Sequence, residues 1–338
     1  MLVFSGEMKR STKSVVLKLK PINLVEAEEA FFESGCSVNP IFAYRNGRVH
    51  SALKKHSVVD FSLLGEAERI IKSCENPQKD ATNDVTGSEL LQRMRDYVVE
   101  LGVVKQVVFQ EARGMLSIAT VLKPGSETPA QERRPIVSVN PDARISSSLA
   151  DGILAHELGT HLLRMINDDH QIWAGAGRKT YKLANHFATE EGLATINTLV
   201  GSGEKLMWNS ALNYVAACKA ARLSFVELFK YLEPYTPDKS KRFKLCARVK
   251  RGLVDTSQPG ACSLDQNYFG GAVEILRSLS TVDIRLLYCG QIALEDLRRL
   301  KNVIRTSCIK LPPFMATPER YSDYVESLKL IAQANMLS

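Results

Sequence analysis

Two histidines and a glutamate in the segment HELGTH are the residues of this sequence whose types and spacing could do chemistry. His156, Glu157 and His161 combine two imidazoles with a carboxylate that could act as a base. A catalytic zinc needs three protein ligands from His, Asp, Glu or Cys, and an open position for water. The segment therefore supplies two candidate metal ligands and predicts a zinc-dependent peptidase.

The spacing of the two histidines differs from the common HExxH pattern. Three residues separate Glu157 from His161, so on a regular α-helix the two imidazoles would point about 140° apart. Both can bind one metal only if the helix is locally widened, and a single-turn π-bulge is a device that often does this at functional sites. Gly159 lies where such a distortion costs least. We therefore expect a π-bulge within this helix.

A third metal ligand is expected from a second helix. In glutamate-zincins this ligand comes from a helix some tens of residues later, often at a Glu-Gly pair. The segment TEEGLATIN places Glu191 directly before Gly192, and Glu190 is the alternative ligand. A carboxylate or carbonyl group usually orients each ligand imidazole through its other ring nitrogen. The sequence does not identify that partner.

Other catalytic patterns are absent from the sequence. It contains no GxSxG elbow, Walker loop, GxGxxG motif or zinc-finger cysteine pattern. The seven cysteines are widely spaced and include no CxxC pair, which favours a reducing compartment. Free cysteines are commonly small buried hydrophobic side chains, and we expect no chemistry from them.

The elements that position these residues can be read from the hydrophobic pattern. Three-and-four periodicity predicts helices at 24–35, 60–74 and 86–102. Runs rich in β-forming residues follow at 103–112, 114–122 and 134–140. A polar connection at 142–148 then starts the helix that carries HELGTH, and the chain from 185 onward has mostly helical periodicity.

The predicted fold class is α+β, with a small, mostly antiparallel sheet, an active-site helix and a largely helical C-terminal half. We expect a basic tail at 1–14, an N-terminal part at 15–200 with the sheet and the zinc-binding helices, and a helical part at 201–338 that closes the substrate cleft. No apolar run approaches the length of a membrane span, and we expect neither a signal peptide nor an anchor.

Several segments resemble the microtubule-associated tyrosine carboxypeptidases, also called tubulin metallocarboxypeptidases. These segments are HELGTHLLRMINDDHQIW, TEEGLATIN, CARVKRGLVDTSQPGACSLDQNYFGGAVEIL, LYCGQIALEDLRRL, LKPINLVEAEEAFF and NPIFAY. The resemblance spans about residues 17–300 and includes the five-residue histidine spacing. It implies a zincin-like exopeptidase that removes C-terminal residues from tubulin tails, tyrosine in some members and glutamate in others.

The resemblance also implies site residues and partners. His156, His161 and Glu191 match the ligands of one zinc ion per chain, and Glu157 matches the catalytic glutamate. Acidic tubulin tails and microtubules are the implied partners of a cytoplasmic, cytoskeleton-associated protein, and we expect no nucleic-acid or membrane partner. The alternative is a non-catalytic, zinc-containing protein that binds microtubule tails, although a structural zinc usually has four protein ligands.

The charge pattern agrees with an acidic substrate. The formal net charge is +7, and the run from Lys239 to Arg251 holds seven basic residues and no acid. Such a run is often only a solvated face. The alternative is that it binds glutamate side chains or the free carboxylate of a substrate tail, for which arginine's bidentate fork is well suited.

Six residues are predicted to bind the substrate. They are Arg248, Lys250, Arg251, Gln266, Tyr268 and Arg164. If 246–251 is extended, Arg248 and Lys250 share one face while Val249 packs inward, and this pair is favoured for the carboxylate. Gln266 and Tyr268 would line the pocket of the leaving residue, although Tyr268 could equally pack in a core.

Overall fold

The computed structural model describes residues 19–45, 49–73, 84–113, 115, 117–124, 133–175 and 177–337. The expected basic tail at 1–14 lies outside them. By internal contacts the chain divides into two compact units, Met1–Asn76 with Ala211–Gln266, and Pro77–Ser210 with Asn267–Ser338. The first unit thus joins the N-terminal helices to a segment that follows residue 210, and the expected parts at 15–200 and 201–338 stay a prediction.

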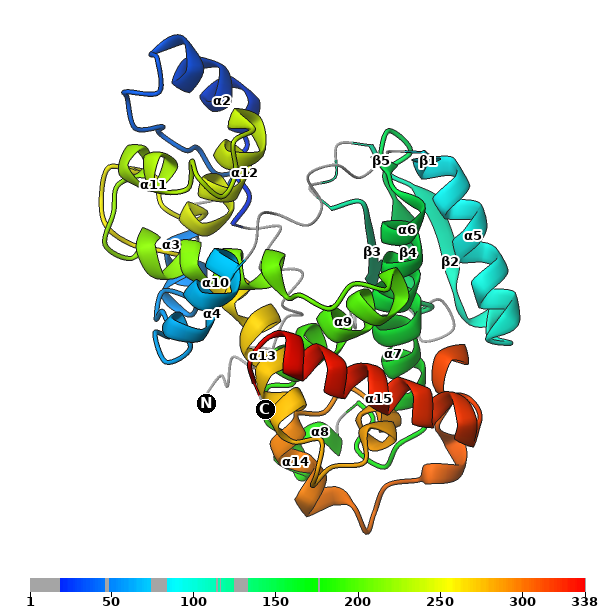
Figure 1. The fold of residues 1–338 in the computed structure, drawn as a ribbon. Helices are drawn as coiled ribbons and strands as arrows, with labels where there is room; N and C mark the ends of the chain where they lie inside the picture. The colour runs from blue at the N-terminus through cyan, green and yellow to red at the C-terminus, as the bar shows by residue number, and fades with distance from the viewer. Residues whose placement is uncertain are drawn as a thin grey trace, which may run out of the picture. The chain divides into compact units, whose positions relative to one another are not determined.

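The first unit is helical and has an aromatic core. Its helices are α2 (Leu24–Glu33), α3 (Val49–Lys54), α4 (Leu64–Ser73), most of α10 (Trp208–Ala220), α11 (Phe225–Tyr231) and α12 (Lys239–Lys250). Phe31 of α2 packs against Phe225 and Phe229 of α11 and Phe243 of α12, with ring centroids 4.9–5.5 Å apart. These large apolar rings hold α2, α11 and α12 together (Figure 1).

The second unit contains two small sheets. The three-stranded sheet has the order β2 (Val108–Glu111), β4 (Ile136–Val139), β3 (Ala119–Leu122), and a second sheet pairs β1 (Val85–Thr86) with β5 (Arg144–Ile145). The β2–β4 pairing is parallel, and the β3–β4 and β1–β5 pairings are antiparallel. The expected small sheet is therefore present, with strands shorter than the predicted runs. It is mixed and not mostly antiparallel, because one of the two pairings of the three-stranded sheet is parallel.

Helices make up most of the rest of the second unit. They are α5 (Gly87–Glu100), α6 (Ser147–Ile153), a π-helical segment (Leu154–Leu162), α7 (Leu163–Asp168), α8 (Gly177–Thr180), α9 (Phe187–Ser202), α13 (Gln266–Arg277), α14 (Leu294–Leu300) and α15 (Pro318–Ala334). Short 3₁₀ turns of this unit lie at Val104–Gln106, Ile284–Cys289, Thr306–Cys308 and Pro313–Met315, and another lies in the first unit at Ser263–Asp265. The mixed α+β class is confirmed.

Local capping explains where the site-bearing helices begin. Thr86 accepts from the Glu89 amide and Glu89 reaches back to the Thr86 amide, a capping box that starts α5. Ser146 accepts from the Leu149 amide at the start of α6, within the polar connection where a helix start was expected. Apolar side chains of β3, β4, α5 and the π-helical segment then form one buried core beneath the site.

One assumption about the C-terminal half does not hold. The preference for Arg248 and Lys250 depends on an extended 246–251, and this segment is helical, because α12 continues to Lys250. Asp238 caps α12 through the Lys241 amide, and Phe243, Cys246 and Ala247 are buried at helical spacing. The long helix α15 lies in the half that was expected to be helical, and it packs against α9 (Figure 1). Among the described residues, no helix is long and apolar enough to span a membrane.

Candidate metal centre

The two histidines lie on one continuous helix that is π-helical from Leu154 to Leu162. This widening compensates for their five-residue spacing, so that their ring centroids lie 5.0 Å apart. The Thr160 hydroxyl donates to the carbonyl of Ala155, five residues earlier, at 2.9 Å. The predicted π-type irregularity is therefore confirmed, and it extends over more than a single turn.

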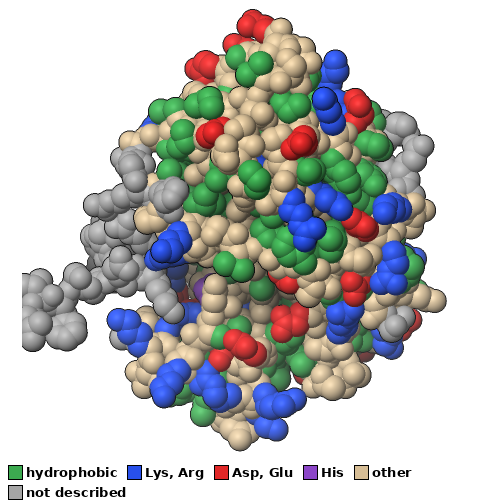
Figure 2. All heavy atoms as spheres, turned by 90° about the vertical axis from the view of Figure 1, so that its left-hand side faces the viewer, with side chains coloured by type: hydrophobic (Ala, Val, Ile, Leu, Met, Phe, Trp, Pro, Cys, Tyr) green, Lys and Arg blue, Asp and Glu red, His purple; other side chains and the backbone are tan. Residues whose placement is uncertain are grey.

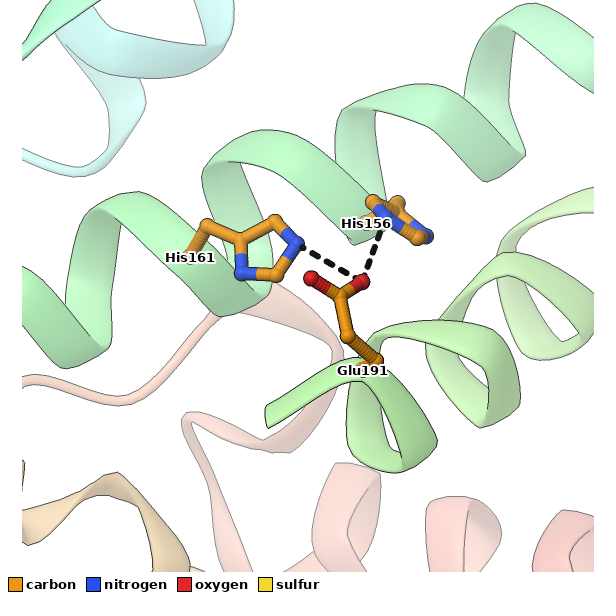
Figure 3. Close-up of side chains that lie close together, drawn as sticks. All are labelled: His156, His161 and Glu191. Atoms are coloured by element: carbon orange, nitrogen blue, oxygen red, sulfur yellow. Dashed lines mark ion pairs between the residues drawn. The ribbon is translucent and has the colours of Figure 1, made fainter. Parts of the chain in front are cut away.

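Glu191 of α9 faces both histidines (Figure 3). Its Oε2 atom lies 3.7 Å from Nε2 of His161 and 4.0 Å from Nε2 of His156. The ligand atoms of these three residues all lie within 4.8 Å of one another. Among the described residues, they form the group that could hold a metal ion.

The hydrogen bonds at Nδ1, the ring nitrogen that points away from Glu191, determine the tautomer of each histidine. Nδ1 of His156 lies 2.9 Å from the hydroxyl of Thr198, and that hydroxyl donates its proton to the carbonyl of Ala194. The hydroxyl has one proton, so toward His156 it must accept, and Nδ1 carries the hydrogen. Nδ1 of His161 donates to the Glu190 carboxylate at 2.9 Å. In both rings Nε2 is therefore the basic nitrogen on the side of Glu191.

The two adjacent glutamates have different positions. Glu191 joins the Nε2 side of both rings, whereas Glu190 binds the Nδ1 side of His161 and forms an ion pair with Arg164 at 2.7 Å. This geometry favours Glu191 over Glu190 as the third ligand. Arg164 is fully buried, and its guanidinium also donates to the carbonyls of Gly290 and Ile292. Its contacts are those of an internal cation, which argues against a role in holding substrate.

Glu157 lies on the same helix as the histidines and is nearly buried. Its Oε2 accepts a hydrogen bond from the Val121 amide of edge strand β3 at 2.9 Å. Its Oε1 lies 4.0 Å from Nε2 of His156. The sheet therefore holds a carboxylate beside the group formed by His156, His161 and Glu191.

A family model described as "Microtubule-associated tyrosine carboxypeptidase" matches residues 39–337. The chain belongs to this family. The "Microtubule-associated tyrosine carboxypeptidase 1" of Mus musculus is 32% identical over 335 residues, which cover 96% of this chain and 70% of the relative. The protein of the same name from Homo sapiens is 32% identical, over 96% of this chain and 69% of the relative.

This member of the carboxypeptidase family does not span the full length of its relatives. A Mus musculus protein named MATCAP2 is 32% identical over 93% of this chain, which spans 61% of that relative. One solved structure, of a lipoprotein from Colwellia psychrerythraea, shares 13% identity at a TM-score of 0.44, over 93% of this chain and 55% of that chain. At this TM-score, the likeness supports no conclusion about this family member.

Arg248 and Arg251, two of the predicted substrate residues, bind the same buried carboxylate. Nε and Nη2 of Arg248 lie 2.8 and 2.6 Å from Oδ1 of Asp265, and Nη2 of Arg251 lies 2.8 Å from Oδ2. Burial raises the pKa of Asp265, but the two guanidinium groups outweigh it and hold that pKa below its usual range. Both arginines thus have an internal anion, and their role toward substrate stays a prediction.

Lys250 and Gln266 are also engaged inside the first unit. The Lys250 ammonium is buried and donates to the carbonyls of Ala220, Leu223 and Gln258 at 2.5–3.0 Å. An ammonium has three hydrogens, so these acceptors use all of them. The side-chain amide of Gln266 exchanges hydrogen bonds with the backbone of Asp60. Tyr268 lies half-buried on α13.

The basic run divides into buried and exposed parts. Arg242, Lys250 and Arg251 are buried, whereas Lys241 and Lys244 are exposed on α12. Figure 2 shows Lys and Arg side chains spread among acidic and hydrophobic ones over the face that it views. The exposed lysines match the expectation of a solvated face, and tail binding by this run stays a prediction.

The structure adds Thr198 and Val121 to the site and gives Glu190, the alternative ligand, a different place in it. Thr198 and Glu190 hold the outer nitrogens of the two histidines, and Val121 holds Glu157. Thr198 stands seven residues after Glu191, two turns along the same helix face, and that spacing could have found it. No comparable pattern marks Val121, because its contribution is a backbone amide.

Proposed function

We propose that this chain is a zincin-like zinc metallocarboxypeptidase that removes the C-terminal residue, tyrosine or glutamate, from tubulin tails. The observation that carries the proposal is the group formed by His156, His161 and Glu191 beside Glu157, in a member of a family named for tyrosine carboxypeptidases. The whole activity is proposed from relatives of which this chain spans 61–70%.

The chemistry of the donor set supports zinc. Two imidazole nitrogens and one carboxylate oxygen are a ligand set of catalytic zinc sites. Atoms bound to a tetrahedral zinc at its usual bond lengths lie about 3.3–3.6 Å apart. The observed separations of 3.7 and 4.0 Å between Glu191 and the two histidines exceed this by a few tenths of an ångström. Three protein donors also leave the open position of a catalytic site, which favours an enzyme over a non-catalytic tail binder.

The protein's own residues would divide the work as follows. His156, His161 and Glu191 would hold the zinc ion, which would supply a Lewis acid for the scissile carbonyl and lower the pKa of a bound water. Glu157 takes the proton from the attacking water and returns it to the leaving amine nitrogen. The Val121 amide holds Oε2 of Glu157 at 2.9 Å and thereby fixes the direction of the carboxylate. Thr198 and Glu190 accept the Nδ1 hydrogens, so that in the neutral tautomer Nε2 of each ring is the basic nitrogen on the side of Glu191.

Incubation with tail peptides tests the proposal. The purified protein should contain close to one zinc per chain and shorten tubulin tail peptides that end in tyrosine, or in one or several glutamates, as read by mass spectrometry. A chelator should stop the reaction, and added zinc should restore it. The variant Glu157→Gln should keep its zinc and lose about 10²- to 10⁴-fold in turnover. Peptide binding without any shortened product would instead identify a non-catalytic tail binder.

A further inference from the structure

We infer that Glu190 and Arg164 are positioning residues that hold His161 in its metal-binding orientation, an inference that rests on the proposed function. The first contact is the hydrogen bond from Nδ1 of His161 to Oε1 of Glu190 at 2.9 Å. Both side chains are almost completely buried. A carboxylate on the outer nitrogen fixes the ring's tautomer and rotation and raises the basicity of Nε2.

Arg164 in turn holds Glu190. It stands three residues after His161, on the same side of the helix, and its Nη1 lies 2.7 Å from Oε2 of Glu190. A buried carboxylate is costly unless it is paired, and this fully buried guanidinium supplies the pair. The two oxygens of Glu190 are thus divided between His161 and Arg164, which sets the plane of the carboxylate.

The other edges of the Arg164 guanidinium are fixed to backbone. Nε donates to the Gly290 carbonyl at 3.1 Å, and Nη2 donates to the Ile292 carbonyl at 2.7 Å. The planar fork therefore has one orientation in which it makes these two hydrogen bonds and the ion pair with Glu190 together. Arginine suits this position better than lysine, because a single ammonium nitrogen lacks the fork's fixed spread of donors.

Residues of α7 also hold the backbone segment whose carbonyls accept from Arg164. Asn167 donates to the Tyr288 carbonyl at 2.7 Å, and Asp168 accepts from the Gln291 amide at 3.0 Å. A side chain on Gly290 would meet Oδ1 of Asp168 at 2.6 Å, so the close approach requires glycine. A chain of contacts therefore runs from this segment through Arg164 and Glu190 to His161.

The zinc affinity of variants tests these contacts independently of enzyme turnover. At one fixed pH, competition with a chelator should give the variant Glu190→Gln a zinc Kd about 10- to 100-fold weaker than that of the wild type. Arg164→Met should weaken it in the same direction. Because Arg164 acts on His161 only through Glu190, the double variant should lose little more affinity than Glu190→Gln alone.

Arg242 provides a matched control in the first unit. It is also a buried arginine with a carboxylate partner, Glu233, at 2.9 Å. Arg242→Met should lower the unfolding temperature without changing the zinc Kd. If Glu190→Gln does not fold, Glu190→Asp keeps the charge but shortens the side chain, and its zinc Kd should also be weaker than that of the wild type.

The outcomes separate the two proposals. A wild type that binds zinc, together with Glu190 and Arg164 variants that bind it as tightly, would overturn the positioning role. If the losses of zinc affinity in the two single variants add up in the double variant, Arg164 does not act through Glu190. A wild type that binds no zinc would instead refute the proposed function.

Discussion

Replacing Gly271 with alanine should loosen the proposed metal site through the packing of two helices. Gly271 of α13 lies against α9 at Gly192, the residue that directly follows Glu191. A Cβ on Gly271 would stand 2.6 Å from the carbonyl carbon of Ala188 and closer still to its oxygen, whereas ordinary contact begins at 3.4 Å. The backbones of α9 and α13 must therefore separate by about 1 Å.

The expected loss of zinc affinity follows from how little metal–ligand distances can vary. Ligand distances hold to about ±0.2 Å, so a shift of about 1 Å at Ala188, one turn before Glu191, would take the carboxylate out of range. We expect Gly271→Ala to reduce zinc affinity by tenfold or more. Overpacking at this crossing should also lower the free energy of unfolding by about 1–3 kcal/mol.

The neighbouring glycine provides the control. A Cβ on Gly270 would meet no atom within 4 Å, and alanine is the better helix former by about 1 kcal/mol. Gly270→Ala should therefore keep wild-type zinc affinity and unfold at the same or a higher temperature. Chelator competition and thermal unfolding, each with and without zinc, check both variants. Wild-type zinc affinity in Gly271→Ala would show that the close crossing of the helices does not position Glu191.

Two further predictions concern stability. The side chain of Asn197 is fully buried and forms hydrogen bonds with Thr160, Tyr288 and Tyr324 at 2.7–2.8 Å. Asn197→Leu should therefore lower the free energy of unfolding in urea by about 2–4 kcal/mol. A loss below about 1 kcal/mol would show that these hydrogen bonds do not stabilise the fold. The lowered pKa of Asp265 means that its stabilising effect is present above the carboxyl's ordinary pKa and is lost as pH falls through the lowered value. Arg248→Gln should raise the pKa of Asp265 and lower the free energy of unfolding at pH 7 by about 1–3 kcal/mol. Acid unfolding should then begin at a higher pH. An unchanged acid transition would mean that Arg248 does not stabilise the ionised carboxylate.

The sequence by itself determined the donor chemistry and the local structure of the site. HELGTH fixed two imidazoles and a carboxylate on one helix, and their five-residue spacing required the π-helical widening that the structure has. The helix start at Thr86 and the polar connection at 142–148 were predicted from the sequence, because caps act within a few residues. These inferences succeeded because the interactions behind them are local in the chain.

Tertiary structure decided which charged residues face the site and which are internal. Arg164, expected to hold substrate, binds carbonyls 126 and 128 residues away, and Lys250 is enclosed by three carbonyls. The choice between Glu190 and Glu191 likewise depends on how α9 lies against the π-helical segment. Residue type shows that a buried charge must be compensated, but the compensating partner is brought by the fold from a distant part of the chain.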